Sequence, residues 1–424
     1  MAEEATGLYI SIPFCRSKCT YCNFASGVYP AAQHERYIDR LIQDLRGAAF
    51  WAGPTGAGLP HQVDTVYLGG GTPSLLAPEL LARLFGAMRE QFDIDPDAEI
   101  TVECAPGQLA DETLEAMAAA GVNRASLGVQ SFIDSEARGS GRLHDRAMVE
   151  DDLRRLRKAG ITNLNLDLIA GLAGQTHASW EESLTALLDC GVPHASIYML
   201  EVDEDSRLGR ELLAGGARYR AGLVPGDDAI ARMYERAIER LGEGGLGQYE
   251  ISNFSHPGFE SRHNLRYWKR RPYLGLGLDA SSMLREGRLH AGMGHEGKPA
   301  GAGLRRQGPG DVLRTKTTDD LAEYLAGPTP VETAWLSPAR QHEEAWFLGL
   351  RLNAGVDVAA LECEFGSAAA EPAMEVAARL AESGLLVADG QIVRLTPQGR
   401  LLSNEVFQEF LGLDALLPDE ALAP

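Results

Sequence analysis

Short apolar runs alternate with longer amphipathic stretches over the first half of the chain. The runs have the length of buried strands, and the stretches repeat apolar residues with the period of a helix. Strands are predicted at Leu8–Ile12, Thr65–Leu68, Glu99–Glu103, Ala125–Val129, Leu164–Ile169 and Ser196–Leu200. Helices are predicted at Gln33–Phe50, Pro78–Phe92, Asp111–Ala120, Arg146–Ala159 and His177–Cys190. Because strands that alternate with helices form parallel sheets, residues 1–225 fit a partial (β/α)6 barrel.

The pattern changes in the second half. Residues 226–330 predict an α+β domain, in which the glycine-rich stretch 284–311 reads as an exposed, flexible insertion. Three helices and two short strands are then predicted at Pro338–Leu352, Val358–Phe365, Ala370–Ser383, Leu385–Val387 and Ile392–Leu395. The turn Asp389-Gly390 between the strands is a hairpin signal. Residues 331–424 therefore predict a winged-helix-like domain.

Composition narrows the functional classes. The chain has 424 residues and a net charge of −21, which argues against broad nucleic-acid binding. No apolar stretch is long enough for a transmembrane helix, so stable membrane insertion is not expected, although peripheral contact stays open. Few cysteines and the lack of a secretory signal predict a cytoplasmic protein. The clearest basic cluster is Arg266, Lys269, Arg270 and Arg271.

Three of the six cysteines lie within eight residues. Cys15, Cys19 and Cys22 follow the first predicted strand, which Pro13 ends, so their thiols share one loop. Three thiolates on a loop suit an iron–sulfur cluster. A 4Fe–4S cube held in this way keeps one iron that can bind a small molecule. Structural zinc would need a fourth ligand, and the nearest histidine is His34. A disulfide would leave one thiol unpaired.

The spacing of these cysteines resembles that of the radical S-adenosylmethionine superfamily. The resemblance implies that the open iron chelates S-adenosylmethionine and that electron transfer from the cluster yields a 5′-deoxyadenosyl radical. It also implies a partial barrel with cofactor contacts at the carboxyl ends of the strands. The matching positions are Tyr9, Tyr21, Gly70, Gly71, Thr72, Glu103, Gln130, Arg142 and Asp167.

Some of these positions also have a physical rationale of their own. The glycines before Thr72 let backbone amides approach a ligand without an intervening Cβ. Glu103 ends an apolar strand, where an unpaired carboxylate is costly, and the planar fork of Arg142 can hold a carboxylate. Simpler interpretations stay open, because glycine runs are often only turns, Glu103 can be a solvated strand end and Tyr9 can be a core tyrosine.

A second motif combines His263, Asn264, Tyr267 and Trp268 with the basic cluster. Histidine can ligate haem iron, aromatic faces can stack on a porphyrin, and Lys or Arg can pair with propionates. The alternative is a packed β-hairpin with a hydrogen-bonded histidine. Composition does not choose between the two.

The run Tyr-Glu-Ile-Ser-Asn-Phe at residues 249–254 and the His-Asn-x-x-Tyr-Trp motif resemble the haem chaperone family HemW. The similarity extends from Tyr9 to the tail at residues 401–407. It implies that haem binds at the motif containing His263 and passes to haem-dependent acceptor proteins. It further implies that S-adenosylmethionine has mainly a structural or gating role.

Two positions depart from the resembled proteins. Coproporphyrinogen oxidases have a fourth cysteine two residues after the third, where this chain has Phe24, and this favours the chaperone branch. Ser281 stands where the HemW family often has a histidine, so that turn gives no support for haem binding. The alternative functions are an oxygen-independent coproporphyrinogen III dehydrogenase, which forms protoporphyrinogen IX by radical decarboxylation, and a radical enzyme acting on an unrelated substrate.

Overall fold

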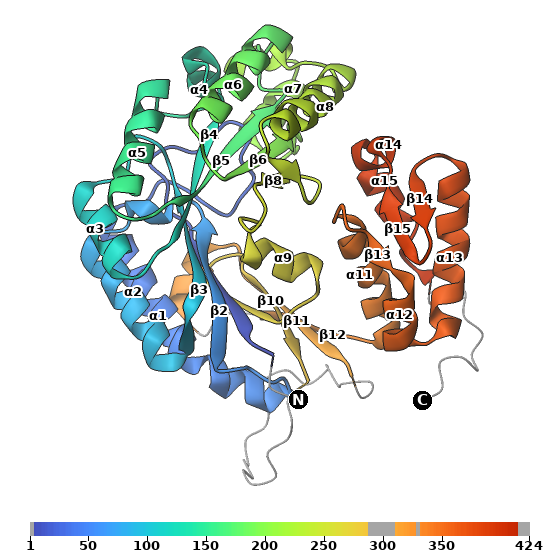
Figure 1. Ribbon diagram of the computed structural model, residues 1–424. Helices are drawn as coiled ribbons and strands as arrows, with labels where there is room; N and C mark the ends of the chain where they lie inside the picture. The colour runs from blue at the N-terminus through green and yellow to red at the C-terminus, as the bar shows by residue number, and fades with distance from the viewer. Residues whose placement is uncertain (1–3, 287–309, 328–330, 414–424) are drawn as a thin grey trace.

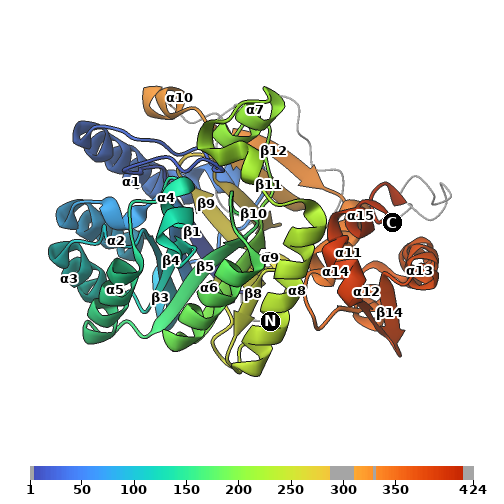
Figure 2. The same ribbon diagram turned by 90° about the horizontal axis from the view of Figure 1, so that it is seen from above.

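One curved sheet organises most of the computed structural model, which describes residues 4–286, 310–327 and 331–413. Within these residues the sheet has twelve strands in the order β12-β11-β10-β9-β1-β2-β3-β4-β5-β6-β8-β7. Strands β1 to β6 run parallel to their neighbours. Helices cover the outside of this parallel part, and a smaller C-terminal unit lies beside it (Figures 1 and 2).

The parallel part confirms the six predicted strands. Its strands are β1 (Thr6–Ile12), β2 (Gln62–Gly70), β3 (Asp93–Cys104), β4 (Arg124–Gln130), β5 (Asn163–Ala170) and β6 (His194–Met199). Its helices are α1 (Ala31–Thr55), α2 (Pro78–Gln91), α3 (Asp111–Ala119), α4 (Asp134–Gly139), α5 (Arg146–Lys158) and α6 (His177–Asp189), with a 3-10 turn, η1 (Pro73–Leu75). The short helix α4 has no counterpart among the predicted elements.

Alternation along the strands separates an apolar outer face from a polar inner face. On β1, Leu8, Ile10 and Ile12 belong to the main core, which they share with α1. Tyr9 alternates with them, and its ring lies near those of Tyr67 and His263. Because alternate strand residues point to opposite faces, the interior of the barrel is lined by polar and aromatic groups.

Residues after β6 first form an exit segment and then extend the sheet at both edges. They comprise α7 (Arg207–Leu213), η2 (Arg218–Leu223), α8 (Asp227–Glu243), β7 (Gly247–Gln248), β8 (Asn253–Ser255), α9 (Arg262–Trp268), β9 (Tyr273–Leu276), β10 (Ser281–Arg285), β11 (Val312–Thr317), α10 (Leu321–Ala326) and β12 (Val331–Leu336). Strand β8 pairs with β6, and β9 pairs with β1. Residues 226–330 thus share the sheet of the barrel, which differs from the separate domain that we expected. Most of the predicted insertion, residues 287–309, lies outside the described residues.

The C-terminal unit has a small sheet and a core of its own. It contains α11 (Pro338–Leu350), β13 (Val356–Asp357), α12 (Val358–Phe365), α13 (Ser367–Glu382), β14 (Leu386–Asp389), β15 (Ile392–Leu395), α14 (Pro397–Leu401) and α15 (Ser403–Gln408). Trp346 stacks on Phe410, with ring centroids 4.9 Å apart, inside this core. The order of three helices followed by a hairpin is as predicted.

Candidate cofactor site

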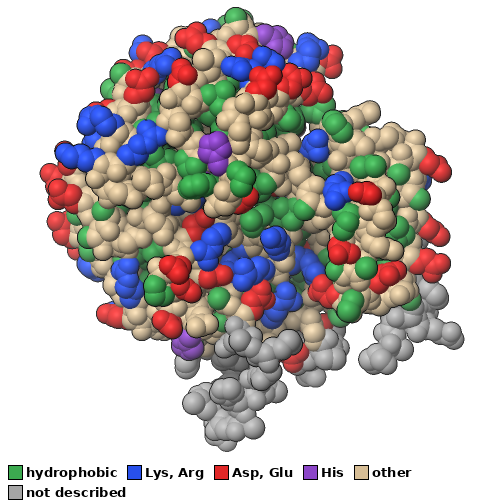
Figure 3. Space-filling view, in the orientation of Figure 1, with side chains coloured by type: hydrophobic (Ala, Val, Ile, Leu, Met, Phe, Trp, Pro, Cys, Tyr) green, Lys and Arg blue, Asp and Glu red, His purple; other side chains and the backbone are tan. Residues whose placement is uncertain are grey.

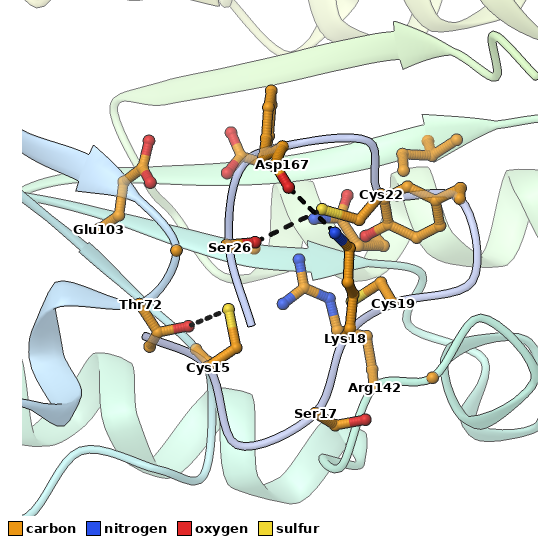
Figure 4. A pocket seen from close by; sticks show the side chains of 18 of the residues that line it. Cys15, Ser17, Lys18, Cys19, Cys22, Ser26, Thr72, Glu103, Arg142 and Asp167 are labelled. Atoms are coloured by element: carbon orange, nitrogen blue, oxygen red, sulfur yellow. Dashed lines mark hydrogen bonds between the residues drawn. The ribbon is translucent and has the colours of Figure 1, made fainter. Parts of the chain in front are cut away.

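A cavity of about 660 Å³ opens at the carboxyl ends of the parallel strands. The cysteine loop, residues 15–24, forms one wall, and the ends of β2 to β6 form the others. Figure 4 shows side chains from both walls facing this space. The lining includes eleven of the predicted residues: Cys15, Cys19, Tyr21, Cys22, Gly70, Gly71, Thr72, Glu103, Gln130, Arg142 and Asp167. The folding of distant strand ends into one barrel mouth explains why these residues meet.

Backbone hydrogen bonds hold the cysteine loop in place. The amide of Gly71 donates to the carbonyl of Ile12 at 2.9 Å, and that of Thr72 donates to Phe14 at 2.8 Å. A Cβ on Gly71 would lie 2.9 Å from the backbone of Phe14, so only glycine allows this approach. The Thr72 hydroxyl also lies 3.9 Å from the Cys15 sulfur, where it donates. The glycine-rich turn therefore supports the loop that carries the thiols.

The carboxylate of Glu103 lies against the same turn. It accepts hydrogen bonds from the Tyr67 hydroxyl at 2.9 Å and from the Gly70 amide at 3.1 Å. A Cβ on Gly69 would lie 3.0 Å from the carboxylate, so this glycine makes room for it. Burial raises the pKa of Glu103 to about 7, and the charge of Asp167 adds to the effect. Glu103 is therefore close to half-protonated near neutral pH.

Three buried polar atoms on the cavity wall have no hydrogen-bond partner within the described part of the chain. They are the Tyr21 hydroxyl, Oε1 of Gln130 and Nε of Arg142. Gln130 has a positive φ of 69° where the register between β4 and β5 shifts, and this bulge turns the strand end. Unpartnered buried polar groups are costly, so these atoms fit a wall that receives a polar ligand.

The donor set also fits an iron–sulfur cluster. Cys15, Cys19 and Cys22 are free, partly buried thiols on one wall. Burial raises the pKa of Cys15. Because a cysteine binds metal as the thiolate, metal binding would have to lower this pKa again. Among residues 4–286, 310–327 and 331–413, no three metal-binding side chains converge closely enough to hold one ion. Three thiols on one loop suit a cube with several irons.

The His263 motif lies away from this cavity, on helix α9. His263 is fully buried, with Nδ1 2.9 Å from the Thr65 hydroxyl and Nε2 2.8 Å from the Tyr267 hydroxyl. Burial, together with the charges of Arg266 and Arg124, lowers the pKa of His263 to about 3. Both ring nitrogens are therefore engaged inside the barrel, and neither is open to haem iron in this conformation.

The other members of the motif join helix α9 to its neighbours. Ser261 caps the helix, because its hydroxyl accepts a hydrogen bond from the backbone amide of Asn264. The Tyr267 ring packs edge-on against Tyr273, and Arg351 of the C-terminal unit lies over the ring of Trp268. The motif forms a helix and not the β-hairpin of the alternative interpretation. Its histidine is hydrogen-bonded, as that interpretation expects.

Lys and Arg side chains gather near the middle of the face shown in Figure 3. In the basic cluster, Arg266 pairs with Asp64, Arg270 with Glu364, and Arg271 with both Glu4 and Asp64. The cluster thus stabilises contacts within the fold through ion pairs, and much of its charge is neutralised there.

Comparisons with known proteins agree with the fold of the barrel and of the C-terminal unit. A model described as the radical SAM superfamily matches residues 9–187, and one described as the HemN C-terminal domain matches residues 336–402. A relative named heme chaperone HemW, from Lactococcus lactis subsp. lactis (strain IL1403), is 35% identical over 97% of this chain and 98% of its own length. The chain belongs to the HemW family. A second HemW, from Mycobacterium tuberculosis (strain ATCC 25618 / H37Rv), is 33% identical over 97% of this chain and 96% of its own.

A solved structure confirms the fold of this HemW-family chain. Coproporphyrinogen III oxidase (HemN) from Escherichia coli, described as a radical SAM enzyme, aligns with a TM-score of 0.77 over 96% of this chain and 90% of that one. At 24% identity the likeness concerns the fold alone, which is the α/β radical SAM fold. No helix within the described ranges of the HemW-family chain has the length and apolar character to cross a membrane.

Several residues that line the cavity were not predicted from the sequence, including Ser126, Tyr198 and Met199. A signal for Tyr198 was present in the sequence, because His194, Ser196 and Tyr198 alternate with apolar residues along the segment that forms β6. That alternation places the tyrosine on the inner face of the barrel. Conversely, Tyr9 packs inside the barrel near Tyr67 and is absent from the cavity lining.

Proposed function

We propose that this chain is a haem chaperone, which binds haem and transfers it to haem-dependent proteins in the cytoplasm. The match to HemW relatives over nearly the whole chain carries the proposal. The cavity with three thiols and unpartnered polar atoms supports a 4Fe–4S cluster and S-adenosylmethionine as its resident cofactors. The haem itself is the cargo.

Different residues of the cavity would hold the cluster and S-adenosylmethionine. Cys15, Cys19 and Cys22 would ligate the cluster, which when bound supplies an electron and an open iron for S-adenosylmethionine. The other lining residues among the predicted set would orient the small molecule through their polar groups. Glu103 would accept from its amino group, and Arg142 would donate to its carboxylate. Asp167, held by the side chains of Ser126 and Asn165, would accept from the ribose.

Haem binding in this proposal does not depend on His263. Coordination by that residue would require its ring to give up hydrogen bonds to Thr65 and Tyr267 inside the barrel. The motif stays a candidate haem contact, and the haem titration below, repeated with His263→Ala, examines it separately.

The decisive experiment is an anaerobic haem titration of the full chain with its cluster reconstituted, followed by the Soret absorbance. We expect saturation near one equivalent. The Cys15→Ala variant should lose the cluster, whereas Cys363→Ala, at an exposed cysteine of α12, should keep it. Absence of saturable haem binding by the wild-type chain would overturn the chaperone proposal, and a normal cluster in Cys15→Ala would overturn the ligand assignment.

The alternative enzyme function is tested on the same preparation. Conversion of coproporphyrinogen III to protoporphyrinogen IX under anaerobic reducing conditions would identify a dehydrogenase in place of a chaperone. Phe24, at the position where the oxidases have a further cysteine, is the residue that argues against this outcome.

A further inference from the structure

A chain of hydrogen-bonded side chains leads from the cavity wall to the start of helix α9. Asp167, on the wall, accepts a hydrogen bond from Nδ2 of Asn165 at 2.8 Å. Oδ1 of Asn165 lies 2.6 Å from Nδ1 of His194, and Nε2 of His194 lies 3.0 Å from the hydroxyl of Tyr249. That hydroxyl accepts from the backbone amide of Ser261 at 3.2 Å. We call Asn165, His194 and Tyr249 the polar relay.

The polar relay lies inside the protein but outside the cavity. Asn165 on β5 and His194 on β6 face each other across the sheet, and Tyr249 lies between β7 and β8. His194 is 0% exposed and Asn165 is 2% exposed. None of the three belongs to the cavity lining, so none would contact a ligand there. Because a buried polar group that loses its partner costs the full desolvation of that group, each member depends on the next.

The two ends of the polar relay fix the direction of every hydrogen bond in it. A carboxylate only accepts, so the amide nitrogen of Asn165 faces Asp167 and its oxygen faces His194. That oxygen also only accepts, so Nδ1 of His194 carries the hydrogen. Burial lowers the pKa of His194 well below its ordinary value, so the ring is neutral and Nε2 accepts from the hydroxyl of Tyr249.

Loss of the Tyr249 hydroxyl would release this order. The hydrogen of His194 would then be free to move to Nε2, and Nδ1 would become an acceptor. Asn165 would turn its nitrogen toward Nδ1 and its oxygen toward Asp167, where two acceptors would face each other. Asp167 would keep only the hydroxyl of Ser126, 3.3 Å from its other oxygen, among the bonds named here. The carboxylate would therefore lose its fixed orientation.

We propose that Tyr249, His194 and Asn165 are positioning residues, which hold the carboxylate of Asp167 in the orientation that receives the ribose of S-adenosylmethionine. This inference rests on the cofactor assignment within the proposed function, and it adds residues outside the cavity to that assignment. It also joins the cofactor site to the first turn of α9, because Ser261 caps that helix. The polar relay makes and breaks no covalent bond.

The test measures the affinity of full-length, cluster-reconstituted variants for S-adenosylmethionine by anaerobic isothermal titration calorimetry. Tyr249→Phe removes one hydroxyl outside the cavity and should weaken binding about fivefold. Tyr324→Phe is the matched control. The hydroxyl of Tyr324 is also buried and donates to Asp44 at 2.7 Å, but it belongs neither to the polar relay nor to the cavity lining. This control should bind like the wild type.

Two further measurements distinguish positioning from a general structural role. In an Asp167→Ala background, Tyr249→Phe should cause no further loss of affinity, because the residue through which it acts is gone. The three loop cysteines and Arg142 are intact there, so binding stays measurable. His194→Asn keeps an amide nitrogen near the position of Nδ1 and should bind within about twofold of the wild type. His194→Leu should bind as weakly as Tyr249→Phe.

The outcomes separate this inference from the assignment on which it rests. If the wild-type chain binds no S-adenosylmethionine, the cofactor part of the proposed function fails. If the wild type binds and Tyr249→Phe binds equally well, the polar relay is overturned while the cofactor assignment stands. Equal weakening by Tyr249→Phe with and without Asp167 would also overturn it. Circular dichroism and iron and sulfide content confirm that each variant is folded and carries its cluster.

Discussion

Replacing Glu103 by glutamine should change how the stability of the cofactor-free protein depends on pH. In the folded chain this carboxyl has a pKa of about 7, compared with an ordinary value of 4.5. A carboxyl whose pKa is raised by folding holds its proton more tightly in the folded state than in the unfolded state. The wild-type protein therefore loses stability as pH rises from about 4.5 to about 7. Glutamine has no proton to lose.

The size of the effect follows from the two pKa values. A pKa moved from 4.5 to about 7 corresponds to about 3 kcal/mol of unfolding free energy. This figure is an upper limit, because the side chain borders a cavity that water can enter. The amide can accept from only one of the two donors, Tyr67 and Gly70, so the variant also loses a hydrogen bond. That loss of about 1 kcal/mol is the same at every pH.

Urea unfolding of the wild type and Glu103→Gln, followed by tryptophan fluorescence, measures the difference. Between about pH 5.5 and about pH 8, the unfolding free energy of the variant minus that of the wild type should rise by up to about 2 kcal/mol. Glu115→Gln, on an exposed position of α3, controls for the loss of one acidic group. A difference that stays constant over this range for Glu103→Gln would refute the reasoning.

Other substitutions test the supports of the site. In Gly71→Ala the new Cβ meets backbone at under 3 Å, so iron and sulfide content after reconstitution should fall. Gly86→Ala, in a helix with open space around it, should keep the cluster and gain about 1 kcal/mol of stability. Asp64→Ala leaves the buried guanidinium of Arg266 without its ion-pair partner and should cost about 3 kcal/mol in denaturant unfolding. Asp39→Ala breaks a more exposed pair and should cost less than about 1 kcal/mol; equal losses would show that burial of the pair is unimportant.

The barrel could be predicted because the sequence pattern that identifies each of its strands and helices is local. Each parallel strand is an apolar run followed by its own helix, and residues at the carboxyl ends of such strands must share one mouth. Thus Gly71, Glu103 and Asp167 could be assigned to one site from the order of the strands together with the family resemblance. The alternation that places Tyr198 inside the barrel was equally local, and it could have been used.

The position of His263 could not be predicted in this way. Its partner Thr65 is 198 residues away, so neither its burial nor its hydrogen bonds have a local signal. The pairing of β9 with β1 also joins residues far apart in the sequence, so it could not be predicted either. Residues 226–330 were therefore expected to form a separate domain. Side chains typical of a haem site, such as His263 and Trp268, are equally suited to packing, and only the tertiary contacts distinguish these roles.

The pairing of β1 with β9 also bears on how the chain acquires its structure during synthesis. Residues 7–10 leave the ribosome well before the strand that closes one of their edges, residues 273–276. Until then one edge of β1 presents unpaired backbone groups, which can recruit strands of other chains. We expect a fragment ending at residue 225 to keep this edge open and to aggregate. Closure of this edge is thus a late event in the folding of the protein, because the strands whose ends line the cavity, β2 to β6, are all made before β9.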